Sequence, residues 1–166
     1  LGAVEVLENL GIKRVQPEAF LTSEFNKPVF TVLSSRHYLQ HKDNKSWNEA
    51  EFRTNPSEFV SGFMEFAKRT DILIPCHYWN PAAPALFSKE DIAQPEFKIS
   101  VISDVTCDIE GSIPTTLRAS TIKAPFYDIS REDCQEKAPF SNPDNITICA
   151  VDNLPCELPL DASKAF

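Results

Sequence analysis

Apolar residues recur at the spacing of an α-helix in two segments of the chain. Residues 1–10 carry such a stripe, and Gly11 follows it at a position where helices commonly end. A second stripe lies within residues 56–67, where phenylalanines recur three and four positions apart, and Asn55 and Pro56 are typical of a helix start. Both segments are predicted to be amphipathic helices. A short helix is expected to start at residues 88–91, and residues 159–166 are expected to be the start of a final helix.

Short apolar runs rich in β-branched residues separate the helices and predict strands. They occupy residues 28–33, 71–75, 98–103 and 146–151. A polar stretch over residues 34–55 is expected to be a long loop, and an irregular region separates the last two strands. Alternating helices and strands are typical of an α/β protein with a doubly wound parallel sheet.

Composition and charge narrow the function classes. The chain has 166 residues, enough for one domain, and a net charge of -8 that disfavours a nucleic-acid partner. No run approaches the roughly 18 apolar residues of a membrane span, and no signal sequence opens the chain. The five cysteines are odd in number and lack C-x-x-C spacing, so we expect reduced thiols, no metal site and a cytoplasmic protein.

Polar or aromatic clusters follow all four predicted strands. Ligands bind at the carboxyl ends of strands in open parallel sheets, so four such endings along one sheet edge predict a binding site. The clusters are Ser34 to His37, Cys76 to Trp79, Asp104 to Asp108, and Asp152 with Asn153.

Some of these residues have two interpretations. Arg36 and its neighbouring serines either begin a solvated loop or hold a ribose 2′-phosphate, since no Asp or Glu stands there to take ribose hydroxyls. Asp104 and Asp108 either cap a turn or orient a cofactor or an ammonium-bearing substrate. Arg118 is either a surface charge or faces an anionic substrate.

Several motifs resemble one enzyme family. The runs DILIPCHYWNPAAPALFSKEDI, ISVISDVTCDIEGSIPTT and ICAVDNLPCELPLDAS resemble the nucleotide-binding domain of lysine-forming saccharopine dehydrogenases, and more closely the lysine–ketoglutarate reductase domain of the bifunctional lysine-degrading enzyme. The opening LGAVEVLENLGIKRVQPEAF is similar to the helix after that family's glycine loop. The wider superfamily includes alanine dehydrogenase and the transhydrogenases.

The resemblance implies roles for individual residues. Cofactor contacts are implied for Gly2, Ser34, Ser35, Arg36, Tyr78, Ser103, Asp104, Val151, Asp152, Asn153 and Leu154. Substrate contacts are implied for Asp104, Val105 and Thr106. The family's first strand and leading glycines are not in this sequence, nor is the amino-terminal domain that carries its Lys and His acid–base pair. No catalytic residue is therefore assigned within the chain.

Together these observations predict a partial Rossmann-like domain over residues 1–166, incomplete at its amino-terminal edge. The expected function is nicotinamide-nucleotide binding, with NADP preferred over NAD, in an oxidoreductase that acts on the C–N bond of an amino acid. Its expected partners are an amino-acid or keto-acid substrate and the amino-terminal domain of the parent chain, so the fragment alone should be inactive. The alternatives are a non-catalytic nucleotide-sensing or structural module and an alanine dehydrogenase-like enzyme.

Overall fold

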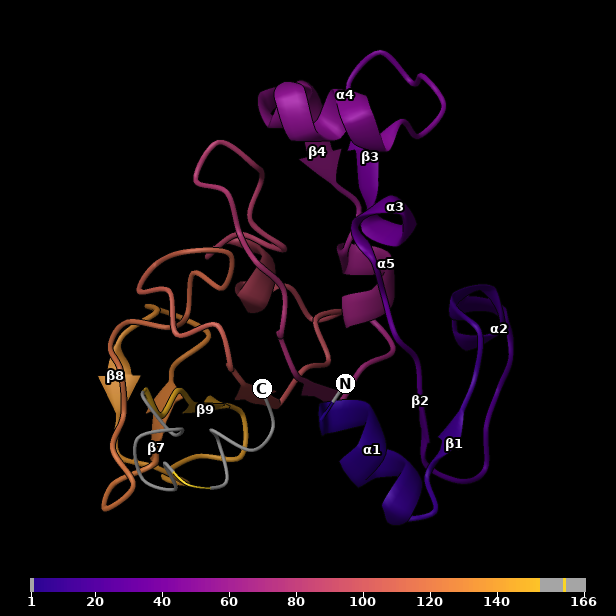
Figure 1. The fold of residues 1–166 in the computed structure, drawn as a ribbon. Helices are drawn as coiled ribbons and strands as arrows, with labels where there is room; N and C mark the ends of the chain where they lie inside the picture. The colour runs from indigo at the N-terminus through magenta and orange to yellow at the C-terminus, as the bar shows by residue number, and fades with distance from the viewer. Residues whose placement is uncertain (1, 153–159, 161–166) are drawn as a thin grey trace. The chain divides into compact units, whose positions relative to one another are not determined.

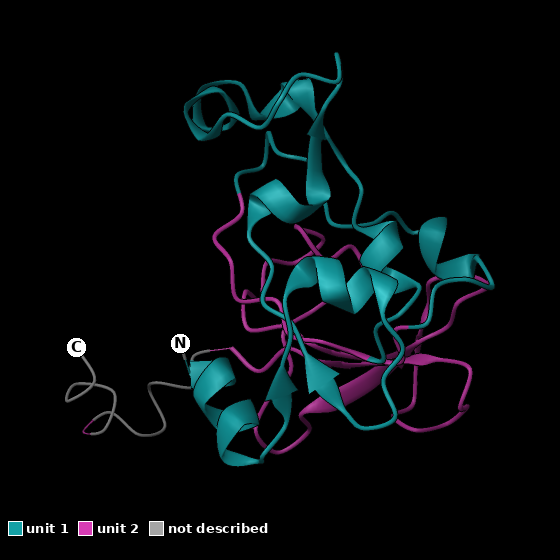
Figure 2. Ribbon diagram, turned by 90° about the vertical axis from the view of Figure 1, so that its right-hand side faces the viewer, with its two compact units in different colours: residues 1–71, 80–98 teal, residues 72–79, 99–166 magenta. Residues whose placement is uncertain are grey.

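The computed structural model describes residues 2–152 and 160, which fall into two compact units (Figure 2). Unit 1 comprises residues 1–71 and 80–98, and unit 2 comprises residues 72–79 and 99–166. Every helix within residues 2–152 belongs to unit 1, whereas the largest sheet in those residues belongs to unit 2. The architecture is mixed α/β, as predicted.

The first helix of unit 1 confirms the prediction from the apolar stripe. Helix α1 spans Gly2–Asn9 (Figure 1), and Gly11 follows it with a φ of 73°. Its end is a Schellman motif: the Gly11 N–H donates to the Glu8 carbonyl at 2.9 Å, and the Ile12 N–H donates to the Leu7 carbonyl at 3.1 Å. A positive φ explains why glycine stands here.

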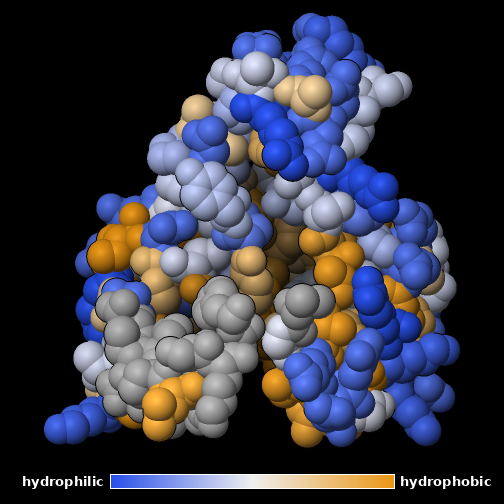
Figure 3. Space-filling model, viewed as in Figure 1, coloured by the Kyte–Doolittle hydropathy of each residue, from blue (hydrophilic) through white to orange (hydrophobic). Residues whose placement is uncertain are grey.

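Short elements make up the rest of unit 1. They are β1 (Lys13–Arg14), α2 (Pro17–Thr22), β2 (Val29–Phe30), α3 (Ser35–Tyr38), β3 (Leu39–His41), α4 (Glu49–Thr54), η1 (Pro56–Glu58), β4 (Phe59–Ser61), α5 (Met64–Ala67) and η2 (Asp91–Ala93). The predicted long loop over residues 34–55 is wrong, because α3, β3 and α4 lie within it. The Asn48 side chain caps α4 by accepting the Glu51 N–H at 3.1 Å. Every residue of α4 is at least partly exposed, and the surface over it is largely hydrophilic (Figure 3).

The predicted helix over residues 56–67 is also wrong in its middle. Strand β4 interrupts it and pairs antiparallel with β3, placing Phe59 opposite His41. Gly62 permits this pairing, because its N–H donates to the Tyr38 carbonyl at 2.6 Å and a Cβ there would lie 3.3 Å from that oxygen. Long-range strand pairing has thus overridden the local helical spacing of the phenylalanines.

Unit 2 is built on a five-stranded sheet in the order β5-β6-β9-β7-β8. Strands β5, β6 and β9 are parallel, while β7 pairs antiparallel with both β9 and β8. Ile102 and Ile148 lie side by side in the ladder and are fully buried, which places the core along the central strands. The strands are β5 (Ile72–Leu73), β6 (Val101–Ser103), β7 (Phe126–Ile129), β8 (Glu136–Lys137) and β9 (Ile146–Cys149).

The sheet corrects the expectation of a purely parallel sheet, because β7 lies in the region predicted to be irregular. This strand was not predicted because it contains an aspartate: Asp128 is fully buried in β7 and accepts a hydrogen bond from Thr147 Oγ1 at 2.9 Å. The cross-strand partner satisfies the carboxylate, so the aspartate does not end the strand.

Two further predictions concern the strand at residues 28–33 and the helix at residues 159–166. Strand β2 pairs with β1 in a separate two-stranded sheet, so only three of the four predicted strands share one sheet in the described part of the chain. Most of the helix predicted at residues 159–166 lies outside the described residues.

Candidate functional site

The carboxyl ends of β5, β6 and β9 meet at one edge of the unit 2 sheet, because these neighbouring strands run parallel. Backbone hydrogen bonds connect the segment after β6 with the segment after β5 and with the last residue of β9. The Val105 N–H donates to the Pro75 carbonyl at 3.1 Å, and the Asp104 N–H donates to the Cys149 carbonyl at 2.7 Å. The predicted clusters around Tyr78, Asp104 and Asp152 therefore follow adjacent strand ends.

Asp104 anchors the loop after β6. It is 2% exposed, and its Oδ1 accepts hydrogen bonds from the Thr106 N–H at 3.0 Å and the Thr106 hydroxyl at 2.5 Å. Its Oδ2 accepts the hydroxyl proton of the fully buried Thr116 at 2.6 Å. The carboxylate thus joins both ends of the loop over residues 104–116. Asp104 therefore caps a turn, as one of its two interpretations predicted, and it does so at the edge where the candidate site lies.

The backbone of the same loop adopts unusual φ values and approaches neighbouring side chains closely. Cys107 and Glu110 have φ values of 52° and 49°, which non-glycine residues seldom adopt. A Cβ on Gly111 would lie 2.5 Å from the Cβ of Asp108 and 3.3 Å from the Trp79 ring, so only glycine fits there. Strained backbone of this kind concentrates at functional sites.

Acidic side chains surround the thiol and imidazole groups at this edge. Burial, reinforced by nearby groups that include Asp104 and Asp152, raises the pKa of Cys107 to about 11. Burial lowers the pKa of His77, although the negative charges of Asp104 and Asp108 oppose that effect. Near neutral pH, the site therefore presents an uncharged Cys107 thiol and an uncharged His77 imidazole.

Three buried polar atoms of unit 2 have no hydrogen-bond partner within the described part of the chain. They are His77 Nε2, Ser112 Oγ and Thr115 Oγ1. All three belong to the segments that follow β5 and β6. Buried polar atoms are nearly always paired in folded proteins, so these segments retain capacity to bind a polar ligand. The importance of His77 was not evident from the sequence, because burial is not readable from a strand-end position.

The remaining predicted residues of this edge differ in exposure. Tyr78 is 93% exposed and Val105 is 60% exposed, whereas Ser103 is half-buried at the end of β6. Val151 forms an isolated parallel bridge with Ser120, and Asp152 is exposed. The predicted contacts at Asn153 and Leu154 lie outside the described residues.

The residues predicted to read the adenosine ribose lie in unit 1, at α3. The Ser34 N–H donates to His37 Nδ1 at 2.8 Å, and the Ser35 side chain hydrogen-bonds to Tyr38. Arg36 is exposed, and its Nε lies 3.4 Å from His37 Nε2. Gly2, also in unit 1, is exposed, and a Cβ there would meet nothing within 4 Å.

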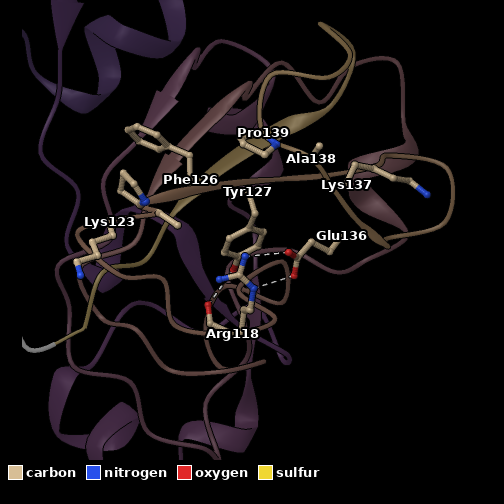
Figure 4. A pocket seen from close by; sticks show the side chains of 10 residues that line it. Arg118, Lys123, Phe126, Tyr127, Glu136, Lys137, Ala138 and Pro139 are labelled. Carbon is tan, nitrogen blue, oxygen red and sulfur yellow. Dashed lines mark hydrogen bonds and ion pairs between the residues drawn. The ribbon is translucent and has the colours of Figure 1, made fainter.

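Two other polar groups have structural partners. An open groove of about 680 Å³ beside β7 and β8 is lined by Arg118, whose Nε and Nη2 donate to the Glu136 carboxylate at 2.9 and 2.8 Å (Figure 4). The guanidinium also stacks 4.4 Å from the Tyr127 ring centroid. In unit 1, His41 is buried, accepts the Asp43 N–H at 3.0 Å and lies 3.3 Å from Glu51. These contacts support structural roles for both side chains.

Metal ligation and membrane spanning find no support in the described residues. Cys76, Cys107, Cys134 and Cys149 are free thiols, while Cys156 lies outside the described part. No group of three or more His, Cys, Asp or Glu side chains among residues 2–152 and 160 is arranged to hold a metal ion. Each helix within those residues is too short or too polar to cross a bilayer.

Comparison with known proteins identifies relatives of this chain. It is 30% identical to the mitochondrial alpha-aminoadipic semialdehyde synthase of Rattus norvegicus over 189 residues, covering 99% of this chain and 20% of that protein. It is 31% identical to the alpha-aminoadipic semialdehyde synthase of Arabidopsis thaliana over 140 residues, covering 81% of this chain and 13% of the relative. No model of a known protein family matches the chain.

A third relative is the saccharopine dehydrogenase [NAD(+), L-lysine-forming] of Emericella nidulans, 26% identical over 107 residues that cover 63% of this chain and 27% of that enzyme. These similarities define a class of oxidoreductase-like proteins. The chain belongs to the saccharopine dehydrogenase and lysine–ketoglutarate reductase family, as its motifs predicted. It spans about a fifth of the length of the Rattus relative. Because that relative is mitochondrial by name, a cytoplasmic location for this chain stays a prediction.

Proposed function

We propose that this chain is a nicotinamide-nucleotide-binding segment of a larger oxidoreductase that acts on the C–N bond of an amino acid. The observation that supports the proposal most is the similarity to alpha-aminoadipic semialdehyde synthase over 99% of the chain. The name of the Emericella relative gives NAD(+) as the cofactor of that enzyme and lysine as its product. A site at the carboxyl ends of parallel strands agrees with this role.

The residues present at the sheet edge fit such a cofactor. The unpaired atoms of His77, Ser112 and Thr115 offer buried hydrogen-bonding capacity. Tyr78 and Val105 expose apolar surface against which a flat ring can lie. We therefore infer that the segments after β5 and β6 hold the nucleotide together with residues 151–154.

When bound, a nicotinamide supplies hydride chemistry, and the protein supplies position and electrostatics. In the proposed reaction, an amino acid and a keto acid condense to an imine, which is then reduced. Asp104 keeps its loop in place through the hydroxyls of Thr106 and Thr116. The proton transfers are proposed to come from a Lys and a His of an amino-terminal domain, as in the family.

Selectivity for NADP is proposed to come from Arg36. Its guanidinium is exposed, and no Asp or Glu stands within residues 34–38 to repel a 2′-phosphate. A charge-assisted contact of about 1.5–3 kcal/mol would favour NADP by roughly ten- to a hundredfold.

Calorimetric titration of the parent protein with NADP and NAD tests this selectivity. The substitution Arg36→Ala should weaken NADP alone, while Arg53→Ala on the exposed helix α4 serves as the matched control. Equal binding of the two cofactors, or equal weakening of both by Arg36→Ala, would show that Arg36 does not read the 2′-phosphate.

Substrate assays on the parent protein test the function itself. We expect NADP-dependent turnover of lysine with 2-oxoglutarate, and of saccharopine in reverse. Nucleotide binding without turnover of any amino acid would indicate the non-catalytic module instead. Turnover of alanine and pyruvate alone would indicate the alanine dehydrogenase-like alternative.

A further inference from the structure

The segment over residues 75–79 lies along the loop that follows β6. At one end, the Pro75 carbonyl accepts the Val105 N–H at 3.1 Å. At the other end, the Trp79 ring lies 3.3 Å from where a Cβ of Gly111 would stand. His77 is at the centre of this segment, and its imidazole lies within the electrostatic range of Asp104 and Asp108 on the facing loop.

The environment of His77 selects the kind of group that it can bind. Nε2 is buried and lacks a hydrogen-bond partner among the described residues. Burial favours the uncharged imidazole, which carries one donor and one acceptor nitrogen. The carboxylates of Asp104 and Asp108 disfavour an approaching phosphate, since like charges repel. An uncharged amide or hydroxyl meets these conditions.

Building on the proposed function, we propose that His77 Nε2 hydrogen-bonds to an uncharged polar group of the bound nucleotide, either its carboxamide or a ribose hydroxyl. His77 is then a ligand-binding residue whose buried atom is unsatisfied until the nucleotide arrives. Such an arrangement sacrifices stability of the free protein for affinity, as binding sites often do.

This trade-off distinguishes a binding residue from a structural one. An apolar substitution, His77→Leu, removes the unpaired atom, so the Tm of the ligand-free protein should rise by about 2–4 °C. The same substitution should weaken nucleotide binding by about three- to tenfold, the equivalent of one lost hydrogen bond. A structural histidine would show the opposite change in Tm.

His41 is the matched control, because both of its ring nitrogens have neighbouring partners in unit 1. The substitution His41→Leu should lower the Tm and leave nucleotide affinity unchanged. A second variant, His77→Gln, keeps a polar group that can donate or accept, so it should retain more affinity than His77→Leu without raising the Tm.

The experiment measures Tm and the Kd for NADP and for 2′-phospho-ADP-ribose in the parent protein and its variants. Weaker binding of both ligands by His77→Leu places the contact in the shared ribose portion. Weaker binding of NADP alone places the contact on the nicotinamide base, at its carboxamide. A fall in Tm, or unchanged affinity for both ligands, would overturn the role of His77. Failure of the unsubstituted protein to bind either ligand would instead overturn the proposed function, and the role of His77 with it.

Discussion

The substitution Asp104→Ala should destabilise unit 2 more than replacement of any exposed aspartate. The Asp104 carboxylate accepts three hydrogen bonds, two from Thr106 and one from Thr116. Thr116 is fully buried, so its hydroxyl would be left without a partner, whereas the half-buried Thr106 can turn toward water. The lost bonds and the unpaired hydroxyl together give a cost of about 3–5 kcal/mol.

Urea unfolding of the protein and three variants measures this cost as a difference in the free energy of unfolding. Asp104→Asn keeps the side-chain size and one acceptor, so we expect a smaller loss of about 1–2 kcal/mol. Asp108→Ala, on an exposed side chain of the same loop, should stay within about 0.5 kcal/mol. If Asp104→Ala is no more destabilising than Asp108→Ala, the carboxylate does not hold the loop and the reasoning is refuted.

Three further predictions concern the same edge and the whole chain. Burial and nearby carboxylates raise the pKa of Cys107 to about 11, and the thiolate is the reactive form, so alkylation of Cys107 by iodoacetamide should be slow at neutral pH. The rate should rise about tenfold per pH unit below that pKa, and Asp152→Asn should increase it. Alkylation at pH 8 as fast as that of a free thiol would contradict the raised pKa. Gly111→Ala should cost about 1–3 kcal/mol in urea unfolding, because its Cβ would lie 2.5 Å from that of Asp108, while Gly2→Ala, with open space, should be neutral or slightly stabilising; equal effects would refute this. The isolated 166-residue chain should show no saturable turnover of saccharopine, since the proposed acid–base pair lies in another domain, and measurable turnover would place catalytic groups within this sequence.

The sequence predicted those elements whose signals are local. Helix α1 follows from its apolar stripe and from Gly11, which marks the end of the helix and has a positive φ. Strands β6 and β9 lie within the predicted apolar runs and pair in parallel. Each of these segments carries its own start, face or end signal within a few residues.

Elements that depend on distant partners were not predicted. Strand β4 pairs with β3, and the informative residue is Gly62, whose close approach to Tyr38 was not visible in the phenylalanine spacing. Strand β7 contains the buried Asp128, whose partners Thr147, Ser141 and Asn145 lie 13 to 19 positions further along the chain. In the candidate site, the acidic loop was predicted from its strand-end position. The burial of His77 Nε2 was not, because burial is a property of packing across the chain.

Both the proposed function and the role of His77 depend on nucleotide binding at the carboxyl ends of β5, β6 and β9. The most direct measurement is backbone amide hydrogen exchange of the parent protein with and without saturating NADP. We expect slower exchange, on nucleotide addition, in residues 76–79, 103–107 and 151–154. Binding at this edge is refuted if NADP does not bind, or if slowed exchange is confined to residues elsewhere, such as those lining the groove beside β7 and β8.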